Sequence, residues 1–371
     1  MKFSIQKKDL QTLLNEHTKV VPLRTTLPIL MCALFEIKKQ ELTIKTTDLD
    51  QTIISKKKIT NEEDGSVAIP TNKLNEIITA LPNEEIRFST NKDNLVEINN
   101  NQGTYKITGR GSDEFPEKNE EETQQNLVLS GEDFIDIVEK TSYAASKDDL
   151  KPALTGVYLN IELTKITAVA TDGHKLVKFE KEITNLNKIE QAIIIPSKFF
   201  NILKNSINTK EDVVININTD QILTKQKEFT FISRIIKEKF PDFNSVIPEN
   251  NKLKGVLNAE EFLSCVKRIA IFSNRTTKQI VATFNADGVV VSAEDIETSA
   301  SGKEHFMCDF EGEEITTSYN AKYLQEVIQH INNKKINIYL NTPLTAAVLK
   351  PEKQKEKENL TTLLMPLRLN V

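Results

Sequence analysis

The stretch AVATDGHKLVKF, at residues 168–179, decides the fold of this chain. Two apolar, β-favouring runs flank Thr171, Asp172 and Gly173. Because glycine tolerates the positive φ that tight turns require, Asp-Gly between two such runs predicts a β-hairpin. His174 and Lys175 would then lie at the mouth of the turn, where a partner can reach them.

Composition favours a cytoplasmic globular protein of two or three domains. The chain has 371 residues, 39% of them hydrophobic, and a formal net charge of −5, so any nucleic-acid binding must come from local basic patches. Cys32, Cys265 and Cys308 are far apart, which favours reduced, buried thiols. We expect neither a signal peptide nor a membrane span, because no apolar run approaches the ~18–20 residues that spanning needs.

One unit of helices and strands recurs three times along the chain. Amphipathic helices are predicted at residues 8–19, 132–145 and 259–272. A strand pair follows each helix, at 34–37 and 42–46, at 157–161 and 166–170, and at 281–284 and 289–292. Second helices are predicted to open at Pro70, Pro196 and Ser318, and strands at 86–89, 213–218 and 336–340 follow them.

The spacing of equivalent residues indicates a threefold internal repeat. Asp48, Asp172 and Asp295 each end a strand pair and lie 124 and 123 positions apart. We therefore predict an α+β fold of three repeated domains, each with two helices packed on antiparallel sheets. The expected boundaries are 1–120, 127–247 and 253–371, separated by polar linkers at 117–126 and 248–254. Residues 351–359 are also polar but are predicted to form a long hairpin loop within the last domain.

Several motifs resemble the bacterial sliding clamps, the β subunits of DNA polymerase III. They are ATDGHKL at 170–176, FPDFNSVIP at 240–248, MPLRL at 365–369, Arg24 with LPIL at 27–30, and LTGV at 154–157. The similarity covers the whole chain. It implies a head-to-tail homodimer, in which six similar domains close into a ring with helices facing double-stranded DNA.

The resemblance implies a processivity factor that performs no chemistry and needs no cofactor. The clamp would bind DNA without reading its sequence and hold the replicative polymerase on its template. Its other expected partners are the clamp loader, translesion polymerases, mismatch-repair proteins and ligase, which would dock through linear peptide motifs. No membrane partner is expected.

The resemblance also implies a peptide-binding pocket between the second and third domains. The second-domain wall comprises Leu154, Thr171, Gly173, His174, Lys175, Leu176, Pro241, Ser245 and Val246. The third-domain wall comprises Asn320, Tyr323, Leu344, Ala346, Leu363, Leu364, Met365, Pro366, Leu367, Arg368 and Leu369. Such a set offers an apolar slot with polar groups at its rim. Judged by its residues alone, the segment 363–367 also fits a final core strand.

This chain departs from the family pattern in a few places. Lys175 and Ser245 stand where relatives commonly carry arginine, and Thr277 stands where an aromatic residue is sometimes found. Asn370 and Val371 extend beyond the usual tail. Because lysine does not reproduce the planar, bidentate contacts of arginine, the motif preference of the pocket remains open.

Two further surfaces follow from the resemblance. The DNA-contacting cations would be Arg24, Lys73, Lys147, Lys198, Lys204 and Lys267. The ring interface would pair a strand at 104–108 with one at 297–305, and would use Lys73, Tyr105, Ile107, Ile271, Phe272 and Glu297.

Two other functions compete with this interpretation. A monomeric peptide-binding scaffold of the same fold is favoured if no dimer forms. A hydrolase using Asp172 and His174 is the second, although no Gly-x-Ser-x-Gly element supplies a nucleophile. The four histidines and three cysteines show no metal-ligand spacing, so no metal site is predicted.

Overall fold

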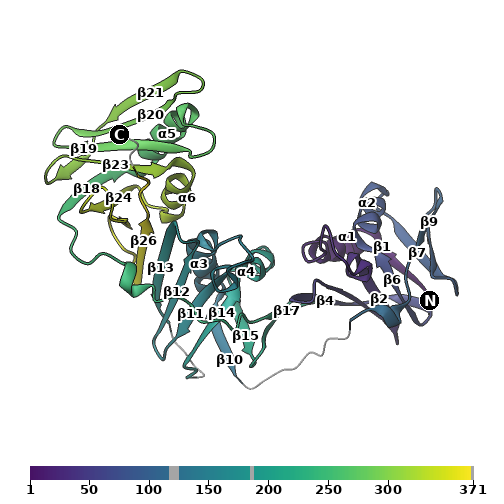
Figure 1. Ribbon diagram of the computed structural model, residues 1–371. Coiled ribbons are helices and arrows are strands. Elements are labelled where there is room, and N and C mark those ends of the chain that lie inside the picture. Colours follow the sequence, from purple (N-terminus) through teal and green to yellow (C-terminus); the bar gives the residue numbers. More distant parts are fainter. Residues whose placement is uncertain (117–124, 184–187, 369–371) are drawn as a thin grey trace. The chain divides into compact units, whose positions relative to one another are not determined.

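The computed structural model describes residues 1–116, 125–183 and 188–368 (Figure 1). The chain divides into two compact units. Unit 1 comprises Met1–Gly131 and Lys198–Ile235, and unit 2 comprises Glu132–Ser197 and Ile236–Val371. Each unit is described by itself below.

The predicted threefold repeat is confirmed in the element order, which is β-α-β-β-β-β-α-β-β-β in each repeat. The first repeat has β1 (Lys2–Gln6), α1 (Lys7–His17), β2 (Cys32–Lys38), β3 (Glu41–Thr47), β4 (Gln51–Lys58), β6 (Gly65–Pro70), α2 (Thr71–Ala80), β7 (Glu85–Thr90), β8 (Leu95–Asn99) and β9 (Thr104–Thr108), with a short extra strand β5 (Thr60–Glu63). The second has β10 (Asn126–Ser130), α3 (Gly131–Thr141), β11 (Gly156–Ile161), β12 (Lys165–Thr171), β13 (Lys175–Glu182), β14 (Gln191–Pro196), α4 (Ser197–Lys204), β15 (Asp212–Ile217), β16 (Gln221–Gln226) and β17 (Phe229–Arg234). The third has β18 (Leu253–Asn258), α5 (Ala259–Ile269), β19 (Gln279–Asn285), β20 (Gly288–Asp295), β21 (Ala300–Phe306), β23 (Ile315–Asn320), α6 (Ala321–Ile331), β24 (Lys335–Leu340), β25 (Ala347–Pro351) and β26 (Glu358–Leu364), with a short extra strand β22 (Asp309–Glu311).

Neighbouring repeats share continuous antiparallel sheets. In unit 1 one sheet has the order β10-β15-β16-β17-β4-β3-β2-β6, because β17 of the second repeat pairs with β4 of the first. In unit 2 another has the order β14-β11-β12-β13-β26-β25-β24-β18-β22, because β26 pairs with β13. The middle repeat therefore contributes one half of its strands to each unit.

Each unit also contains a smaller sheet that ends at an unpaired strand. Unit 1 has the order β5-β1-β7-β8-β9, and unit 2 has the order β21-β20-β19-β23. Within each of these sheets, β9 and β21 are edge strands. Their exposed backbone groups are available for pairing.

Helical periodicity places apolar side chains on the sheets. Helix α1 buries Leu10, Leu13 and Leu14 and packs beside α2, and α5 packs beside α6 in the same way. Asn258 and Asn320 begin α5 and α6 by accepting hydrogen bonds from backbone N–H groups of the first turn. The helices of the described segments are all too short or too polar to cross a membrane.

The ends of several helices differ from the prediction. Helix α3 ends at Thr141 and α5 at Ile269, and the remaining predicted residues form 3₁₀ turns at Ser142–Ala144 and Ala270–Phe272. The predicted helix start at Ser318 is wrong, because residues 318–320 are the last residues of β23. Asn320 caps α6, which begins at Ala321. The hairpin loop at 351–359 is confirmed, since β25 ends at Pro351 and β26 begins at Glu358.

Candidate functional site

The β12–β13 turn is held by a set of short hydrogen bonds. The Thr171 hydroxyl donates to the Lys175 carbonyl at 2.7 Å, and Asp172 Oδ1 accepts the backbone N–H groups of His174 and Lys175, both at 2.9 Å. Gly173 has φ +87°, a value that favours glycine. The quoted sequence therefore forms the predicted hairpin, with Gly173 and His174 exposed at its tip.

Lys175 is buried beneath this turn and is only 4% exposed. Its ammonium lies 2.6 Å from Asp172 Oδ2 and 3.1 Å from a Glu326 carboxylate oxygen, and 4.6 Å from the centre of the Tyr323 ring. Burial alone would lower the pKa of Lys175, but its hydrogen bonds and attraction to Asp172 and Glu326 outweigh burial and raise it. Lys175 is thus a charged link between the hairpin and α6, and it is not accessible at the mouth of the turn as we expected.

Polar and aromatic groups from α6 complete the rim beside the turn. The His174 imidazole stacks on the Tyr323 ring, with 5.3 Å between ring centres and 16° between planes. Asn320 Oδ1 accepts from the backbone N–H groups of Lys322 at 3.0 Å and Tyr323 at 3.4 Å, and its amide donates to the Thr277 carbonyl at 3.0 Å. Asn320 therefore positions Tyr323 against His174.

The tail after β26 runs beside the hairpin and β23. The backbone N–H of Met365 donates to the His174 carbonyl at 2.8 Å, and that of Leu367 donates to the Ser318 carbonyl at 2.8 Å. The Ser318 hydroxyl donates to the Leu367 carbonyl at 2.8 Å, and the Gln279 amide donates to the Arg368 carbonyl at 3.0 Å. These bonds fix residues 365–368 at the edge of the site.

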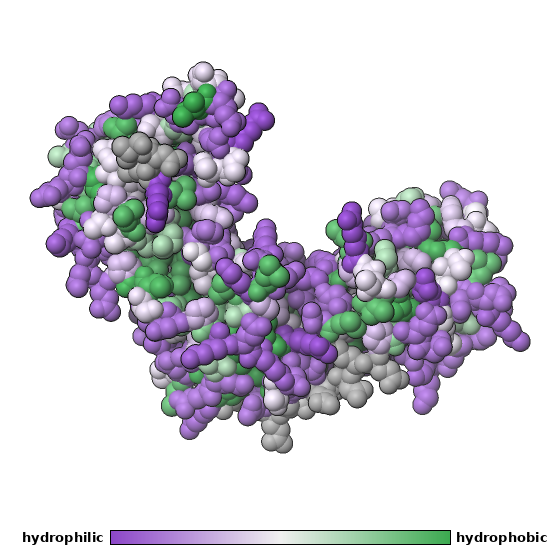
Figure 2. Space-filling view, viewed as in Figure 1, coloured by the Kyte–Doolittle hydropathy of each residue, from purple (hydrophilic) through white to green (hydrophobic). Residues whose placement is uncertain are grey.

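A cluster of buried apolar side chains, here called the apolar floor, includes Leu176 and Leu363 from the two predicted walls. Its side chains come from the 3₁₀ turn Pro152–Leu154, from β12, β13, β14, β25 and β26, and from the segment before the second linker: Ala153, Val169, Leu176, Ile194, Phe240, Val348 and Leu363. Leu154, Tyr158, Ile236, Phe243, Ile247 and Tyr339 pack against it and are partly buried. At the surface Val246, Leu344 and Met365 are 54%, 69% and 47% exposed. In Figure 2 apolar residues gather over the part of unit 2 where Figure 1 labels β13 and β26.

Unit 2 holds every described residue of the predicted pocket, but not all of them present surface to a ligand. Ala346 and Leu364 are 7% and 1% exposed. Leu364 neighbours Leu363 on one strand, so the two side chains face opposite sides of the sheet and only Leu363 joins the floor. Pro241, Ser245 and Arg368 are exposed, Thr171, Pro366 and Leu367 are half-buried, and Leu369 lies outside the described residues.

Sequence reasoning missed two kinds of residue here. Phe240, Phe243 and Ile247 pack on the floor although only their motif neighbours were predicted to line the pocket. Their apolar character inside FPDFNSVIP was the available signal. Glu326, which pairs with Lys175, carried no signal, because a helix surface glutamate is ordinarily solvated.

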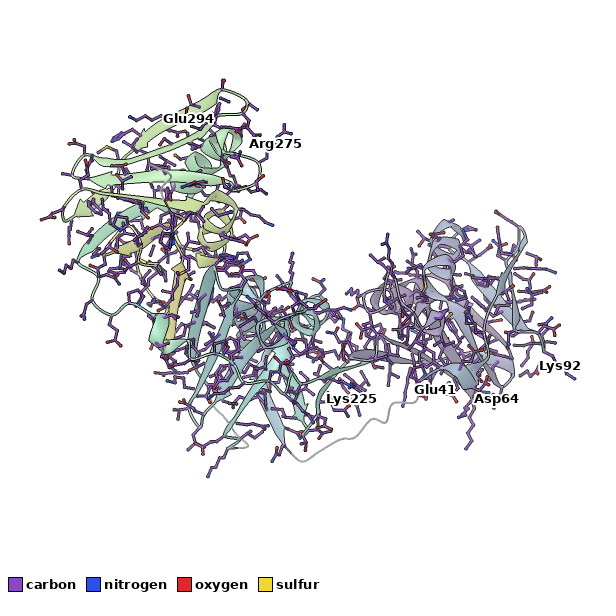
Figure 3. The ribbon with its side chains drawn as sticks, viewed as in Figure 1. Glu41, Asp64, Lys92, Lys225, Arg275 and Glu294 are labelled. Atoms are coloured by element: carbon purple, nitrogen blue, oxygen red, sulfur yellow. The ribbon has the colours of Figure 1, made fainter. Side chains whose placement is uncertain are left out.

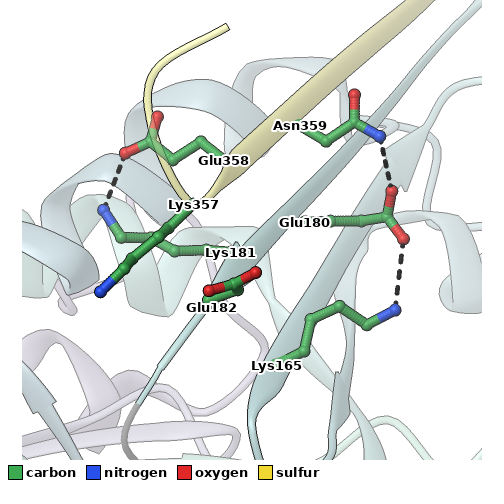
Figure 4. Close-up of a pocket in the computed structure, with 7 residues that line it drawn as sticks. All are labelled: Lys165, Glu180, Lys181, Glu182, Lys357, Glu358 and Asn359. Carbon is green, nitrogen blue, oxygen red and sulfur yellow. Dashed lines mark hydrogen bonds and ion pairs between the residues drawn. The ribbon is translucent and has the colours of Figure 1, made fainter.

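A second hollow, of about 320 Å³, is lined mostly by charged residues at the other end of the hairpin (Figure 4). Lys181 lies 2.8 Å from Asp133 and 2.8 Å from Glu358, and Lys140 lies 2.6 Å from Glu358. Burial alone would raise the pKa of Glu358, but its hydrogen bonds to Lys140 and Lys181 outweigh burial and lower it to about 2. These groups neutralise one another and tie α3 and β13 to β26.

The described residues contain no arrangement suited to catalysis by Asp172 and His174. Asp172 accepts from two backbone N–H groups and from Lys175, while the His174 ring stacks on Tyr323. Among residues 1–116, 125–183 and 188–368, no group of three or more His, Cys, Asp or Glu side chains is placed to hold a metal ion. Cys32, Cys265 and Cys308 are free and buried.

The predicted DNA-contacting cations are distributed over both units. Arg24, Lys73 and Lys198 are exposed in unit 1, and Lys147 and Lys267 are exposed in unit 2. Lys198 forms an ion pair with Asp48, and Lys73 lies 3.1 Å from Glu76. Lys204 is half-buried and interacts with other residues of the chain, so it is not a free cation.

Most of the predicted interface residues lie at the two edge strands or in the turns before β21, and Lys73 lies on α2. Tyr105 on β9 is 37% exposed, but Ile107 is only 8% exposed, so its side chain is already buried in unit 1. In unit 2 Ile271 is 78% exposed and Glu297 is exposed in the turn before β21. Phe272 is half-buried, and a Cβ on Gly302 of β21 would lie 2.5 Å from its ring, so Phe272 contacts its own sheet.

Comparisons with known proteins agree along the whole chain. Family models described as the DNA polymerase III beta subunit N-terminal, central and C-terminal domains match residues 1–119, 128–242 and 244–368. A Staphylococcus epidermidis protein named beta sliding clamp is 27% identical over 382 residues, and one from Staphylococcus aureus is 25% identical over 377; each alignment covers 99% of both chains.

Solved structures show the same fold. The DNA polymerase III subunit beta from Pseudomonas aeruginosa aligns with a TM-score of 0.90 at 23% identity and covers 100% of both chains. A sliding clamp from Bartonella birtlesii, solved bound to griselimycin, aligns with a TM-score of 0.92 at 23% identity over 100% of both chains. The Bacillus subtilis sliding clamp gives 0.89 at 24% identity and covers 100% of this chain and 99% of its own.

Proposed function

This chain belongs to the DNA polymerase III beta subunit family, and from that premise we propose that two copies join head to tail into a closed ring around double-stranded DNA. The family consists of sliding clamps, which are non-catalytic processivity factors of DNA polymerase. The function of the chain is therefore to keep a polymerase on its template. The ring, its interface, its DNA contacts and its peptide partners are the proposal developed here.

The observation that carries the ring is the pattern of strand pairing between repeats. The β4 strand of the first repeat pairs with β17 of the second, and the equivalent β13 of the second pairs with β26 of the third. The equivalent strand of the third repeat is β21, and the last strand of the first repeat is β9. Both are sheet edges, so a second copy can supply the missing pairing at each end. Head-to-tail pairing of this kind closes into a ring when the rotation permits.

The exposed side chains beside these strands suit such a contact. Ile271 and Tyr105 would lose apolar surface to water, and Lys73 would find an acid such as Glu297 on the other copy. Ile107 and Phe272 would support the two edge strands from within their own units. We expect Ile271 and Tyr105 to contribute more of the binding energy between the two copies than Ile107 and Phe272 do.

The exposed cations would hold DNA loosely. Phosphate contacts carry no sequence information and weaken with salt, which suits a ring that slides. Arg24 is exposed and forms no ion pair in the described part of the chain, so it is the first DNA-contacting candidate. We expect Lys198 to contribute less, because Asp48 already neutralises it.

Unit 2 would dock linear peptides on its apolar floor. A peptide could place apolar side chains against Leu176 and Leu363 and meet His174 and Arg368 at the rim. The polymerase catalytic subunit, the clamp loader, translesion polymerases, mismatch-repair proteins and ligase would compete for it in the cytoplasm. Deleting residues 365–371 should abolish the binding of such peptides and of griselimycin, which the Bartonella birtlesii clamp binds, but should leave the ring.

The ring is tested by its retention on DNA. Protein placed on circular duplex DNA by a clamp loader should stay bound at high salt and leave once the circle is linearised. Ile271→Glu should abolish retention and sediment as the 42.0 kDa single chain, whereas Leu163→Glu, at an exposed hairpin turn of unit 2, should behave as wild type. Equal retention on circular and linear DNA would contradict the ring and favour a monomeric scaffold. Arg24→Ala should still form the ring, but the slope of log affinity for DNA against log salt concentration should become shallower by about one, as expected for the loss of one phosphate contact.

A further inference from the structure

The hairpin turn of the peptide site has a counterpart in unit 1. The turn between β3 and β4 spans residues 47–51, which are 124 positions before residues 171–175. Thr47 Oγ1 donates to the Gln51 carbonyl at 2.9 Å, and Asp48 Oδ1 accepts the N–H groups of Asp50 at 3.1 Å and Gln51 at 2.7 Å. The Arg234 N–H donates to the Asp50 carbonyl at 2.8 Å. In unit 2, Thr171 and Asp172 make the same bonds as Thr47 and Asp48. The N–H of Met365, which donates to the His174 carbonyl, corresponds to that of Arg234.

A cavity opens beside this turn, as the floor of the peptide site lies beside the other. It has a volume of about 100 Å³ and is lined by Lys45, Thr47, Leu49, Thr52, Ile54, Phe115, Pro116 and Arg234. Phe115 and Pro116 stand 125 positions before the Phe-Pro pair of the FPDFNSVIP motif. Ile232 pairs with Thr52 in the same register as Leu363 pairs with Leu176. Equivalent positions of the two sheets therefore lie beside the cavity of unit 1 and the apolar floor of unit 2.

One residue at the cavity is held in an unfavourable backbone conformation. Leu49 has φ +80°, at the position where the other turn has Gly173 with φ +87°. A residue with a Cβ rarely adopts this conformation, and glycine would adopt it freely. The Leu49 side chain is nevertheless 41% exposed, so burial of this side chain does not explain the strained backbone conformation. Backbone strain that persists at an exposed apolar residue points to a function for the side chain.

The charges at the cavity select its ligand. Lys45 and Arg234 line it, and within the described residues neither of them has an ion pair. Of the two acids in the turn, Asp48 is paired with Lys198, and exposed Asp50 does not line the cavity. Leu49, Ile54, Phe115 and Pro116 supply apolar walls. The volume is far below the roughly 300–1,000 Å³ typical of small-molecule sites and suits a single aliphatic side chain.

We propose that this cavity is a second peptide-docking site, which takes one aliphatic anchor residue flanked by acidic residues. The anchor would enter between Leu49 and Phe115, and the flanking carboxylates would pair with Lys45 and Arg234. The inference rests on the proposed peptide-docking role of unit 2 only for the kind of ligand, since the geometry and charges are those of unit 1. The two sites would differ in charge preference, because Arg234 stands where unit 2 has Met365.

A photo-crosslinking experiment on the full chain tests this site. The probe is the peptide acetyl-Asp-photoleucine-Glu-amide, with acetyl-Asn-photoleucine-Gln-amide as its neutral match, and the labelled residues are mapped by mass spectrometry. We expect the acidic probe to label the segments 45–54 and 115–116 at least fivefold more than the neutral probe does. Arg234→Glu should lower this labelling at least fivefold and Arg234→Lys should largely keep it. Lys92→Glu, at the outer edge of unit 1 in Figure 3, should leave it unchanged.

A second variant separates docking from folding. Leu49→Gly relieves the backbone strain, so the thermal midpoint should be no lower than in wild type, while labelling of 115–116 falls at least fivefold. Equal labelling by the two probes, or labelling that Arg234→Glu leaves unchanged, would overturn the proposal. Labelling confined to unit 2 would overturn it and leave the proposed function standing, whereas failure of the DNA-retention test would leave this result unaffected.

Discussion

A single buried imidazole should make the stability of unit 1 depend on pH. His17, in the last turn of α1, is fully buried, with Nδ1 2.8 Å from Thr46 Oγ1 and Nε2 2.8 Å from Ser55 Oγ. Neither neighbour is charged, so a proton on the ring would leave a buried cation without a counter-ion. Burial accordingly lowers the pKa of His17 from 6.5 to about 3.

The size of the effect follows from this shift. Between pH 6.5 and pH 3 the unfolded chain binds a proton at His17 and the folded chain does not, so acidification lowers the free energy of unfolding. The loss from this residue is about 2 kcal/mol at pH 5 and about 5 kcal/mol below pH 3. Above pH 7 the imidazole is neutral in both states, and its contribution no longer varies.

Urea unfolding of wild type and His17→Gln at pH 7.5 and pH 5.0 measures this term. The wild type should lose about 2 kcal/mol more than the variant on going to pH 5.0. His305→Gln, which replaces an exposed histidine of unit 2, should keep the wild-type pH dependence. In an NMR titration the His17 ring protons should not shift between pH 8 and pH 5. A His17→Gln variant with the full wild-type dependence, or a His17 signal that titrates near pH 6.5, would refute the reasoning.

Substitutions at three other positions test a turn, a helix cap and an ion pair of unit 2. Gly173→Ala should lower the free energy of unfolding by about 1–2 kcal/mol in chemical denaturation, because alanine is strained at φ +87° although there is space for its Cβ; an unchanged value would contradict the turn geometry. Asn320→Ala should cost about 1 kcal/mol by removing the cap of α6, and Asn320→Asp, a comparable cap, should restore it. Glu358→Gln should cost about 2–3 kcal/mol in the same assay, because Lys140 and Lys181 lose their shared carboxylate; a loss below 0.5 kcal/mol would show that water replaces it.

The parts of the fold that local sequence determines were predictable. The turn at 171–173 and its flanking strands form as expected, because Asp-Gly chemistry and β-favouring runs act within a few residues. The helices were found from their apolar spacing, and the repeat from spacings near 124. The helix ends were less predictable, since residues 142–144 and 270–272 keep apolar spacing while the backbone tightens into 3₁₀ turns.

Pairings between distant segments left no comparable signal. Nothing in the sequence of β4 or β17 identifies the other strand as its partner, because strand preference depends on the neighbours that a strand packs against. Lys175 was expected to be accessible at the mouth of the Asp-Gly turn, where lysine is ordinarily solvated. Its burial depends on Glu326, which is 151 positions away and reaches it only once β13 and α6 are in place. The candidate site was thus predictable as a set of motifs, but the role of each side chain was not.

The turn of the third repeat differs from the turns of the first two. The turns at 47–51 and 171–175 share their hydrogen bonds, and beside each of them two repeats join within one chain. The third turn is different: Glu294 stands at the position of the threonine, and Asp295 accepts a hydrogen bond from Thr298 at 2.9 Å in a wider turn before β21. A junction inside the chain stays closed, so a rigid turn can fix its strand register. In the proposed ring, the junction between two copies would have to open for loading onto DNA, and the different turn before β21 would lie beside that junction.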